Sequence, residues 1–150
     1  MLKKRFSQNL IKDGNVLDKM VRVMDVTAGD RIIEIGPGQG DLTARLCAKA
    51  GRVVAIEIDR AFEDELRGLE ARYPHLTVVF ADVLTVDLGR FMEGPVRVVG
   101  NIPYHITGPI LFAVVGMRRM VSDAFFTMQK EVAERIVSPY GRKSYGSLSV

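Results

Sequence analysis

The residues best suited to chemistry lie at the ends of four separate apolar runs of this sequence. The first run, Arg31-Ile-Ile-Glu-Ile35, ends in three alternating glycines, Gly36, Gly38 and Gly40. Glycine lacks Cβ, so it adopts positive φ and lets the backbone come close to a ligand, and a helix that follows presents free N–H groups. The pattern predicts a nucleotide-binding loop, although any tight strand-to-helix turn can also use glycine.

Two carboxylates close the next two apolar runs. Glu57 ends the run Val53-Val-Ala-Ile-Glu57, 21 residues after Gly36, where a carboxylate can accept hydrogen bonds from both ribose hydroxyls. Asp82 ends the run Val78-Val-Phe-Ala-Asp82 and could accept from an adenine amine, while Val83 could pack on the ring. Either acid alone could be a solvent-exposed strand end. Together with the glycines they predict a nucleoside ligand.

The fourth run, Val96-Arg-Val-Val99, leads into Gly100-Asn-Ile-Pro-Tyr-His105. Asn101 offers an amide oxygen as an acceptor, Pro103 fixes the turn, and Tyr104 supplies a flat face. These parts suit an exocyclic amine, because hydrogen bonds from its N–H groups help to localise its lone pair. Stacking on an aromatic ring is worth about 1 to 3 kcal/mol per base and would replace part of what a flipped base loses. A plain turn containing Asn, Pro and Tyr is the alternative.

Hydrophobic periodicity predicts the elements that position these residues. An amphipathic helix over Val16 to Met24, capped by Asp13, comes first, and further helices begin near Gly40, Arg60, Thr107 and Glu131. A shorter turn is expected around residues 87–92. Strands are expected at about 31–35, 52–56, 77–80, 96–99, 121–126 and 147–150. Strands that alternate with helices and are apolar along their length predict an α/β fold with a mostly parallel sheet covered on both faces. In such a sheet, ligands bind beyond the carboxyl ends of the strands.

Length and composition favour one globular domain over residues 1–150, since 47% of the residues are hydrophobic and 26% are charged. No apolar run reaches the ~18 residues of a membrane span, and Met1-Leu-Lys-Lys-Arg5 is not followed by the apolar segment of a signal peptide. We therefore expect a cytoplasmic protein without membrane contact. Cys47 is the only cysteine and is expected to be a small buried hydrophobe, and His75 and His105 are poor metal ligands. No metal site is expected.

Charge is distributed unevenly around a formal net charge of +3. Residues 1–30 and 118–150 together carry twelve Lys/Arg and seven Asp/Glu, whereas residues 31–117 carry nine and eleven. Basic ends around a mildly acidic middle would suit a polyanionic substrate. Ordinary solvated surface charge is the alternative.

The acidic-x-Gly-x-Gly-x-Gly pattern from Glu34 to Gly40 resembles the first motif of S-adenosylmethionine-dependent methyltransferases. A dinucleotide fingerprint would need a glycine at the place of Asp41. A nicotinamide-dependent oxidoreductase is therefore disfavoured, and no Tyr-Lys or His-Asp catalytic pair supports it.

Over essentially all 150 residues the chain resembles the ribosomal RNA adenine dimethyltransferases, which convert adenosine to N6,N6-dimethyladenosine. The segments that carry this resemblance are Phe6-Ser-Gln-Asn-Leu-Ile-Lys-Asp13, Glu34-Ile-Gly-Pro-Gly-Gln-Gly-Asp-Leu-Thr43, Ala55-Ile-Glu-Ile-Asp59, Ala81-Asp82, Gly100-Asn-Ile-Pro-Tyr104, Met128-Gln-Lys-Glu-Val-Ala-Glu-Arg135 and Tyr145-Gly-Ser-Leu-Ser-Val150.

The resemblance implies a Rossmann-like class I methyltransferase fold, S-adenosylmethionine as the cofactor and ribosomal RNA or the small-subunit precursor as the partner. It implies a cofactor-binding set of Gln8, Asn9, Ile11, Gly36, Gly38, Glu57, Ile58, Asp82, Val83 and Asn101. It implies that Asn101, Pro103 and Tyr104 hold the target amine.

The segments 128–135 and 145–150 favour the branch that modifies small-subunit rRNA over the antibiotic-resistance branch that modifies large-subunit rRNA. Members of the family continue into a last strand and a C-terminal helical domain, so the chain resembles a cofactor-binding domain without them. Its fifth strand would then expose an unpaired edge that invites self-association or pairing with residues 145–150. A module that binds cofactor or RNA without turnover is a further alternative.

Overall fold

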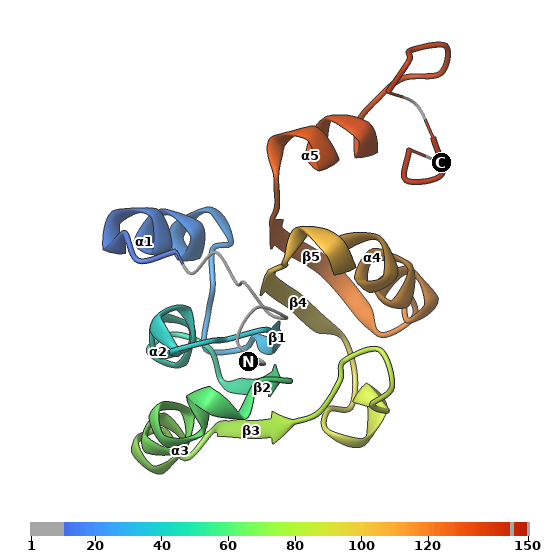
Figure 1. The fold of residues 1–150 in the computed structure, drawn as a ribbon. Helices are drawn as coiled ribbons and strands as arrows, with labels where there is room; N and C mark the ends of the chain where they lie inside the picture. Colours follow the sequence, from blue (N-terminus) through green and yellow to red (C-terminus); the bar gives the residue numbers. More distant parts are fainter. Residues whose placement is uncertain (1–10, 145, 150) are drawn as a thin grey trace.

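The computed structural model describes residues 11–144 and 146–149. Its core is a five-stranded sheet in the order β3-β2-β1-β4-β5, and every neighbouring pair of strands is parallel (Figure 1). The strands are β1 (Arg31–Ile35), β2 (Arg52–Glu57), β3 (Leu76–Phe80), β4 (Val96–Asn101) and β5 (Val121–Thr127). The predicted parallel α/β fold is confirmed, and Glu57 and Asn101 are the last residues of their strands.

Helices cover both faces of this sheet. The α-helices are α1 (Gly14–Val23), α2 (Asp41–Cys47), α3 (Glu63–Arg72), α4 (Thr107–Gly116) and α5 (Lys130–Ile136). Short 3-10 turns are η1 (Arg60–Phe62), η2 (Leu88–Arg90) and η3 (Tyr104–Ile106). In Figure 1, α1, α2 and α3 lie on one side of the sheet and α4 on the other, while α5 extends away from it. No helix of the described residues is long and apolar enough to cross a membrane.

The central strands are apolar along their length because both of their faces are buried. In β1, Ile32 packs in the cluster on the side of α1 and α2, whereas Ile33 packs in the cluster on the side of α4. In β2, Val53 and Val54 divide between the same two clusters. Alternate side chains of a strand point to opposite faces, so a sheet covered on both sides needs continuous apolar runs.

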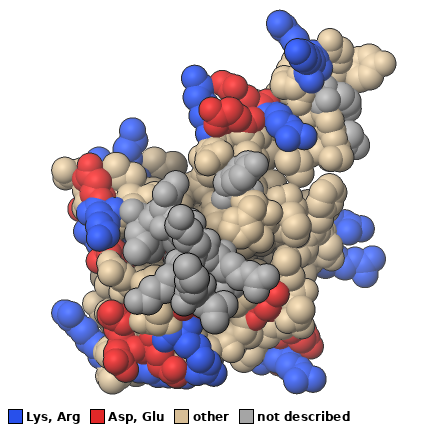
Figure 2. Space-filling view, in the orientation of Figure 1, with Lys and Arg blue, Asp and Glu red and all other residues tan. Residues whose placement is uncertain are grey.

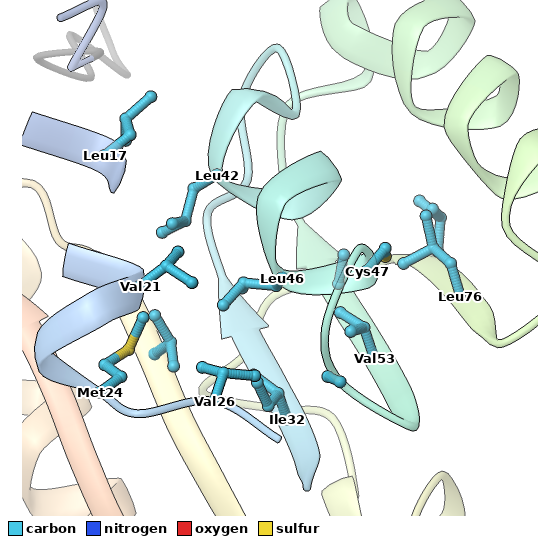
Figure 3. Close-up of a cluster of buried hydrophobic side chains, with 14 of the residues drawn as sticks. Leu17, Val21, Met24, Val26, Ile32, Leu42, Leu46, Cys47, Val53 and Leu76 are labelled. Atoms are coloured by element: carbon cyan, nitrogen blue, oxygen red, sulfur yellow. The ribbon is translucent and has the colours of Figure 1, made fainter. Parts of the chain in front are cut away.

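Helix α1 follows the predicted pattern closely. Asp13 caps it by accepting a hydrogen bond from the backbone N–H of Asn15 at 2.9 Å. Its buried positions Leu17 and Val21 belong to the same core cluster as Leu42 of α2, and Val21 and Leu42 point toward one another (Figure 3). This contact places α1 beside the glycine loop that begins α2.

The prediction of a strand at 147–150 is wrong for those of its residues that the structure describes. Residues 146–149 form a turn in which the Ser149 N–H donates to the Gly146 carbonyl at 2.9 Å. The Ser149 hydroxyl donates to the Arg135 carbonyl, so this turn lies against α5. A strand needs a neighbouring strand as a hydrogen-bond partner, and α5 leads the chain away from the sheet (Figure 1). Within the described residues β5 is the last strand of the sheet, and self-association through its edge stays a prediction.

Candidate functional site

The glycine loop joins the carboxyl end of β1 to the start of α2. Gly36, Gly38 and Gly40 have φ values of +68°, +57° and +87°, in the left-handed region that favours glycine. A Cβ on Gly40 would also lie 2.3 Å from Cδ1 of Leu69. Glycine at this position therefore lets the loop turn sharply into α2 while α3 packs against it.

Glu57 holds the loop in place from the end of β2. Its side chain is fully buried, and its carboxylate accepts hydrogen bonds from the backbone N–H groups of Gly38 and Asp59, both at 2.9 Å. Sequence reasoning placed Glu57 and Gly38 in one site but did not foresee that they bond to each other. The two bonds tie the carboxylate at the end of β2 to the glycine loop and to the turn that follows β2.

A cavity of about 190 Å³ lies at the carboxyl ends of β1, β2, β3 and β4. Its lining is mostly apolar and contains six of the predicted residues, namely Gly36, Glu57, Ile58, Asp82, Val83 and Pro103. The exposed fraction of Ile58 is 43%, which is high for an isoleucine and reflects its place on the cavity wall. The Asp82 carboxylate also accepts from the Leu84 N–H at 2.9 Å, which closes the turn after β3.

A second, smaller cavity of about 30 Å³ lies between α1, the glycine loop and the end of β4. It brings together the predicted residues Ile11, Gly36 and Asn101 with Met20 of α1. Gly36 lines both cavities, so they form two parts of one site. Strands β2 and β3 lie on one side of β1, whereas β4 and β5 lie on its other side. A crevice at the strand where the order switches in this way is the usual ligand position in such folds.

Glu34 was predicted only as the acidic residue of the glycine motif, yet it lines the smaller cavity. Its side chain is 1% exposed, and burial raises its pKa from 4.5 to about 7. The Thr43 hydroxyl donates to its carboxylate at 2.6 Å, which opposes this rise, and the charge of Glu57 adds to it. The hydrogen bond from Thr43 to Glu34 depends on the packing of α2 against β1, so the sequence alone does not predict it.

Asn101 is fixed by β5, which sequence reasoning did not include in the site. Its Oδ1 accepts a hydrogen bond from the Thr127 hydroxyl at 2.7 Å, and the next backbone N–H, of Ile102, donates to the Thr127 carbonyl at 3.2 Å. The turn then continues through Pro103, whose carbonyl accepts from the Ile106 N–H and the Thr107 hydroxyl, both at 3.2 Å.

Three predicted site residues lie wholly or partly outside the described part of the chain. Gln8 and Asn9 fall among residues 1–10. The backbone of Tyr104 begins η3, directly after the larger cavity's Pro103, and its side chain is outside the description. Their roles stay predictions.

Basic residues of the C-terminal part are exposed, as a role in binding a polyanion requires. Arg118 and Arg119 follow α4, and Arg142 and Lys143 follow α5. The last two share an open hollow with Glu131, Glu134 and Arg135 of α5. On the face drawn in Figure 2, Lys and Arg lie close to Asp and Glu around α5.

Cys47 is buried, and burial raises the pKa of its thiol to about 12, so it is a core residue and no nucleophile. Among the described residues no group of three or more His, Cys, Asp or Glu side chains could hold a metal ion.

Comparison with known proteins shows the family of this chain. The family model of ribosomal RNA adenine dimethylases matches residues 1–150. Ribosomal RNA small subunit methyltransferase A from Leptothrix cholodnii is 41% identical over 151 residues, which cover 99% of this chain and 55% of that protein. The chain thus spans about half the length of the curated relatives it matches.

Solved structures agree with this assignment. A dimethyladenosine transferase from Plasmodium falciparum superposes with a TM-score of 0.81 at 30% identity, covering 94% of this chain and 50% of that one. The 23S rRNA methyltransferase ErmE has a TM-score of 0.78 at 30% identity, covering 89% and 53%. An RNA methyltransferase from Salinibacter ruber, solved with S-adenosyl-L-homocysteine, shares the fold with a TM-score of 0.60 at 21% identity, covering 81% of each chain. The chain belongs to the ribosomal RNA adenine dimethylase family.

Proposed function

We propose that residues 1–150 form a domain that binds S-adenosylmethionine, and that the protein transfers methyl groups to the N6 amine of adenosines in small-subunit ribosomal RNA. One observation carries this proposal: Gly36, Glu57, Asp82 and Asn101 stand at or just beyond the ends of four neighbouring strands and line two cavities that share Gly36. The family and the name of the Leptothrix relative support the rRNA substrate. Such an enzyme would act in the cytoplasm, where ribosomal subunits assemble.

The larger cavity is suited to the nucleoside part of the cofactor. Asp82 would accept from the adenine amine, and Ile58 and Val83 would pack against the ring on the apolar wall. Glu57 would accept from the ribose hydroxyls while it keeps its two backbone partners. The methionine part would then extend past Gly36 into the smaller cavity, toward Asn101 and beneath Ile11.

The target amine would meet the methyl group beside Asn101. S-adenosylmethionine supplies a methyl group on a positively charged sulfur. We assign the side-chain acceptor to the Asn101 Oδ1, which the Thr127 hydroxyl holds at the end of β4. A backbone carbonyl would accept from the second N–H of the target amine. The Pro103 carbonyl already accepts two hydrogen bonds, so we assign this role to the Ile102 carbonyl. Tyr104 would stack on the base.

Calorimetry with S-adenosylmethionine tests the cofactor assignment through two matched aspartates. Asp82 and Asp87 each accept from the backbone N–H two residues later, at 2.9 and 3.1 Å, but only Asp82 lines the larger cavity. We expect Asp82→Ala to weaken binding by about tenfold or more, because a hydrogen bond to a charged group is worth about 1.5 to 3 kcal/mol. Asp87→Ala should bind as the parent does. Equal affinity in all three proteins would refute the adenine assignment.

Methyl transfer from labelled S-adenosylmethionine tests the reaction and its substrate. We expect label to enter small-subunit rRNA from cells that lack the modification, and not large-subunit rRNA. Label in large-subunit rRNA would instead support the large-subunit branch, and one of the structural neighbours, ErmE, is a 23S rRNA methyltransferase. Cofactor binding with no transfer to either RNA would mean that this domain is a binding module.

A further inference from the structure

Thr127 contacts the Asn-Ile-Pro turn twice. It is the last residue of β5, and the register of the parallel strands pairs it with Asn101 at the end of β4. Its hydroxyl donates to the Asn101 Oδ1 at 2.7 Å, a normal length for such a bond. Its backbone carbonyl accepts from the Ile102 N–H at 3.2 Å. One residue of β5 therefore holds both the side chain and the backbone of the turn.

We propose that Thr127 is a positioning residue for methyl transfer, which sets the orientation of the Asn101 amide. This inference rests on the proposed role of Asn101. The oxygen and nitrogen of an amide are nearly the same size, so rotation by about 180° would leave packing almost unchanged. It would present an N–H group to the target amine, where an acceptor is needed. In the structure the Thr127 hydroxyl donates to Oδ1 and so restrains the amide in the productive orientation, and a rotated amide would require this hydroxyl to change from donor to acceptor.

The surroundings of Thr127 are mostly apolar. Thr127 lines an apolar groove of about 230 Å³ between α1 and β5, together with Met20 and Phe125. Met20 also lines the smaller cavity next to Asn101, so the groove and the cavity adjoin. The hydrogen bond between Thr127 and Asn101 is itself partly buried, and a hydrogen bond is electrostatically stronger where the local dielectric is lower than in water.

Kinetics of two Thr127 variants separate positioning from packing. Thr127→Val keeps the shape and removes the hydroxyl, whereas Thr127→Ser keeps the hydroxyl. We expect Thr127→Val to lower kcat about tenfold with unchanged KM for S-adenosylmethionine, and Thr127→Ser to stay near the parental kcat. Parental kcat in Thr127→Val would overturn the proposal. A loss shared by both variants would also overturn it, because it would indicate packing.

A double-mutant cycle with Asn101→Asp tests whether Thr127 acts through the orientation of residue 101, because a carboxylate is symmetric. Asn101→Asp carries two equivalent oxygens, so its orientation does not need to be set. Adding Thr127→Val to Asn101→Asp should therefore cost clearly less than tenfold in kcat. An equal loss in both backgrounds would mean that Thr127 does not act through the orientation of residue 101.

NMR of the 150-residue chain tests the orientation without relying on activity. We expect Thr127→Val to shift the side-chain amide resonances of Asn101 and to increase their mobility, while Thr127→Ser leaves them close to the parent. Unchanged Asn101 resonances in Thr127→Val would overturn the inference. If the parent transfers no methyl group, the proposed function fails, and this measurement still decides whether Thr127 orients the amide.

Discussion

The buried carboxyl group of Glu34 should make the stability of this fold depend on pH. Its pKa is raised from 4.5 to about 7, with burial as the largest cause. A folded-state pKa above the unfolded value means that the folded protein binds the proton more tightly. The stabilisation is therefore fully present below pH 4.5 and is lost as the pH rises through about 7. The difference corresponds to about 3 kcal/mol.

Urea denaturation of the parent and Glu34→Gln across this pH range measures the effect. Glutamine keeps the size of the side chain and a carbonyl that can accept from Thr43, but it does not titrate. The free energy of unfolding of the parent should fall by about 3 kcal/mol relative to Glu34→Gln between pH 4.5 and 8. Glu65→Gln, an exposed control in α3, should follow the parent. Parallel pH profiles for the parent and Glu34→Gln would refute the reasoning.

Three further changes test the loop, the sheet and the surface. Gly40→Ala should lower the melting temperature, at a cost of about 1 to 3 kcal/mol, because φ is +87° and the new Cβ would clash with Leu69; an unchanged Tm would contradict this. Arg97→Met should cost about 2 to 4 kcal/mol in urea denaturation, since Arg97 is mostly buried between two aspartates at 3.0 and 2.9 Å; equal stability would show that these ion pairs contribute nothing net. Replacing Arg142 and Lys143 by Gln should reduce the salt dependence of rRNA binding by about one to two counterions, and an unchanged slope would mean that they make no phosphate contact.

The sequence by itself determined the local elements and the ends of the strands. Continuous apolar runs predict buried parallel strands because a strand covered on both faces has no polar side. A polar residue or glycine directly after such a run marks the edge where ligands bind, and this alone placed Gly36, Glu57, Asp82 and Asn101 at one end of the sheet. Asp13 as the cap of α1 follows from the same local chemistry.

Only the tertiary structure decided which side chains touch across the sheet. Thr127 lies 26 residues from Asn101, and their hydrogen bond depends on the order and register of β4 and β5. The bond from Gly38 to Glu57 and the raised pKa of Glu34 likewise arise from burial that no local pattern encodes. The segment 147–150 has a β-like composition, which is a local property. A strand forms only where a neighbouring strand completes its backbone hydrogen bonds, so composition alone led to a wrong prediction there. Long-range pairing, which propensity does not determine, therefore sets both the last strand of this sheet and the partners of its site.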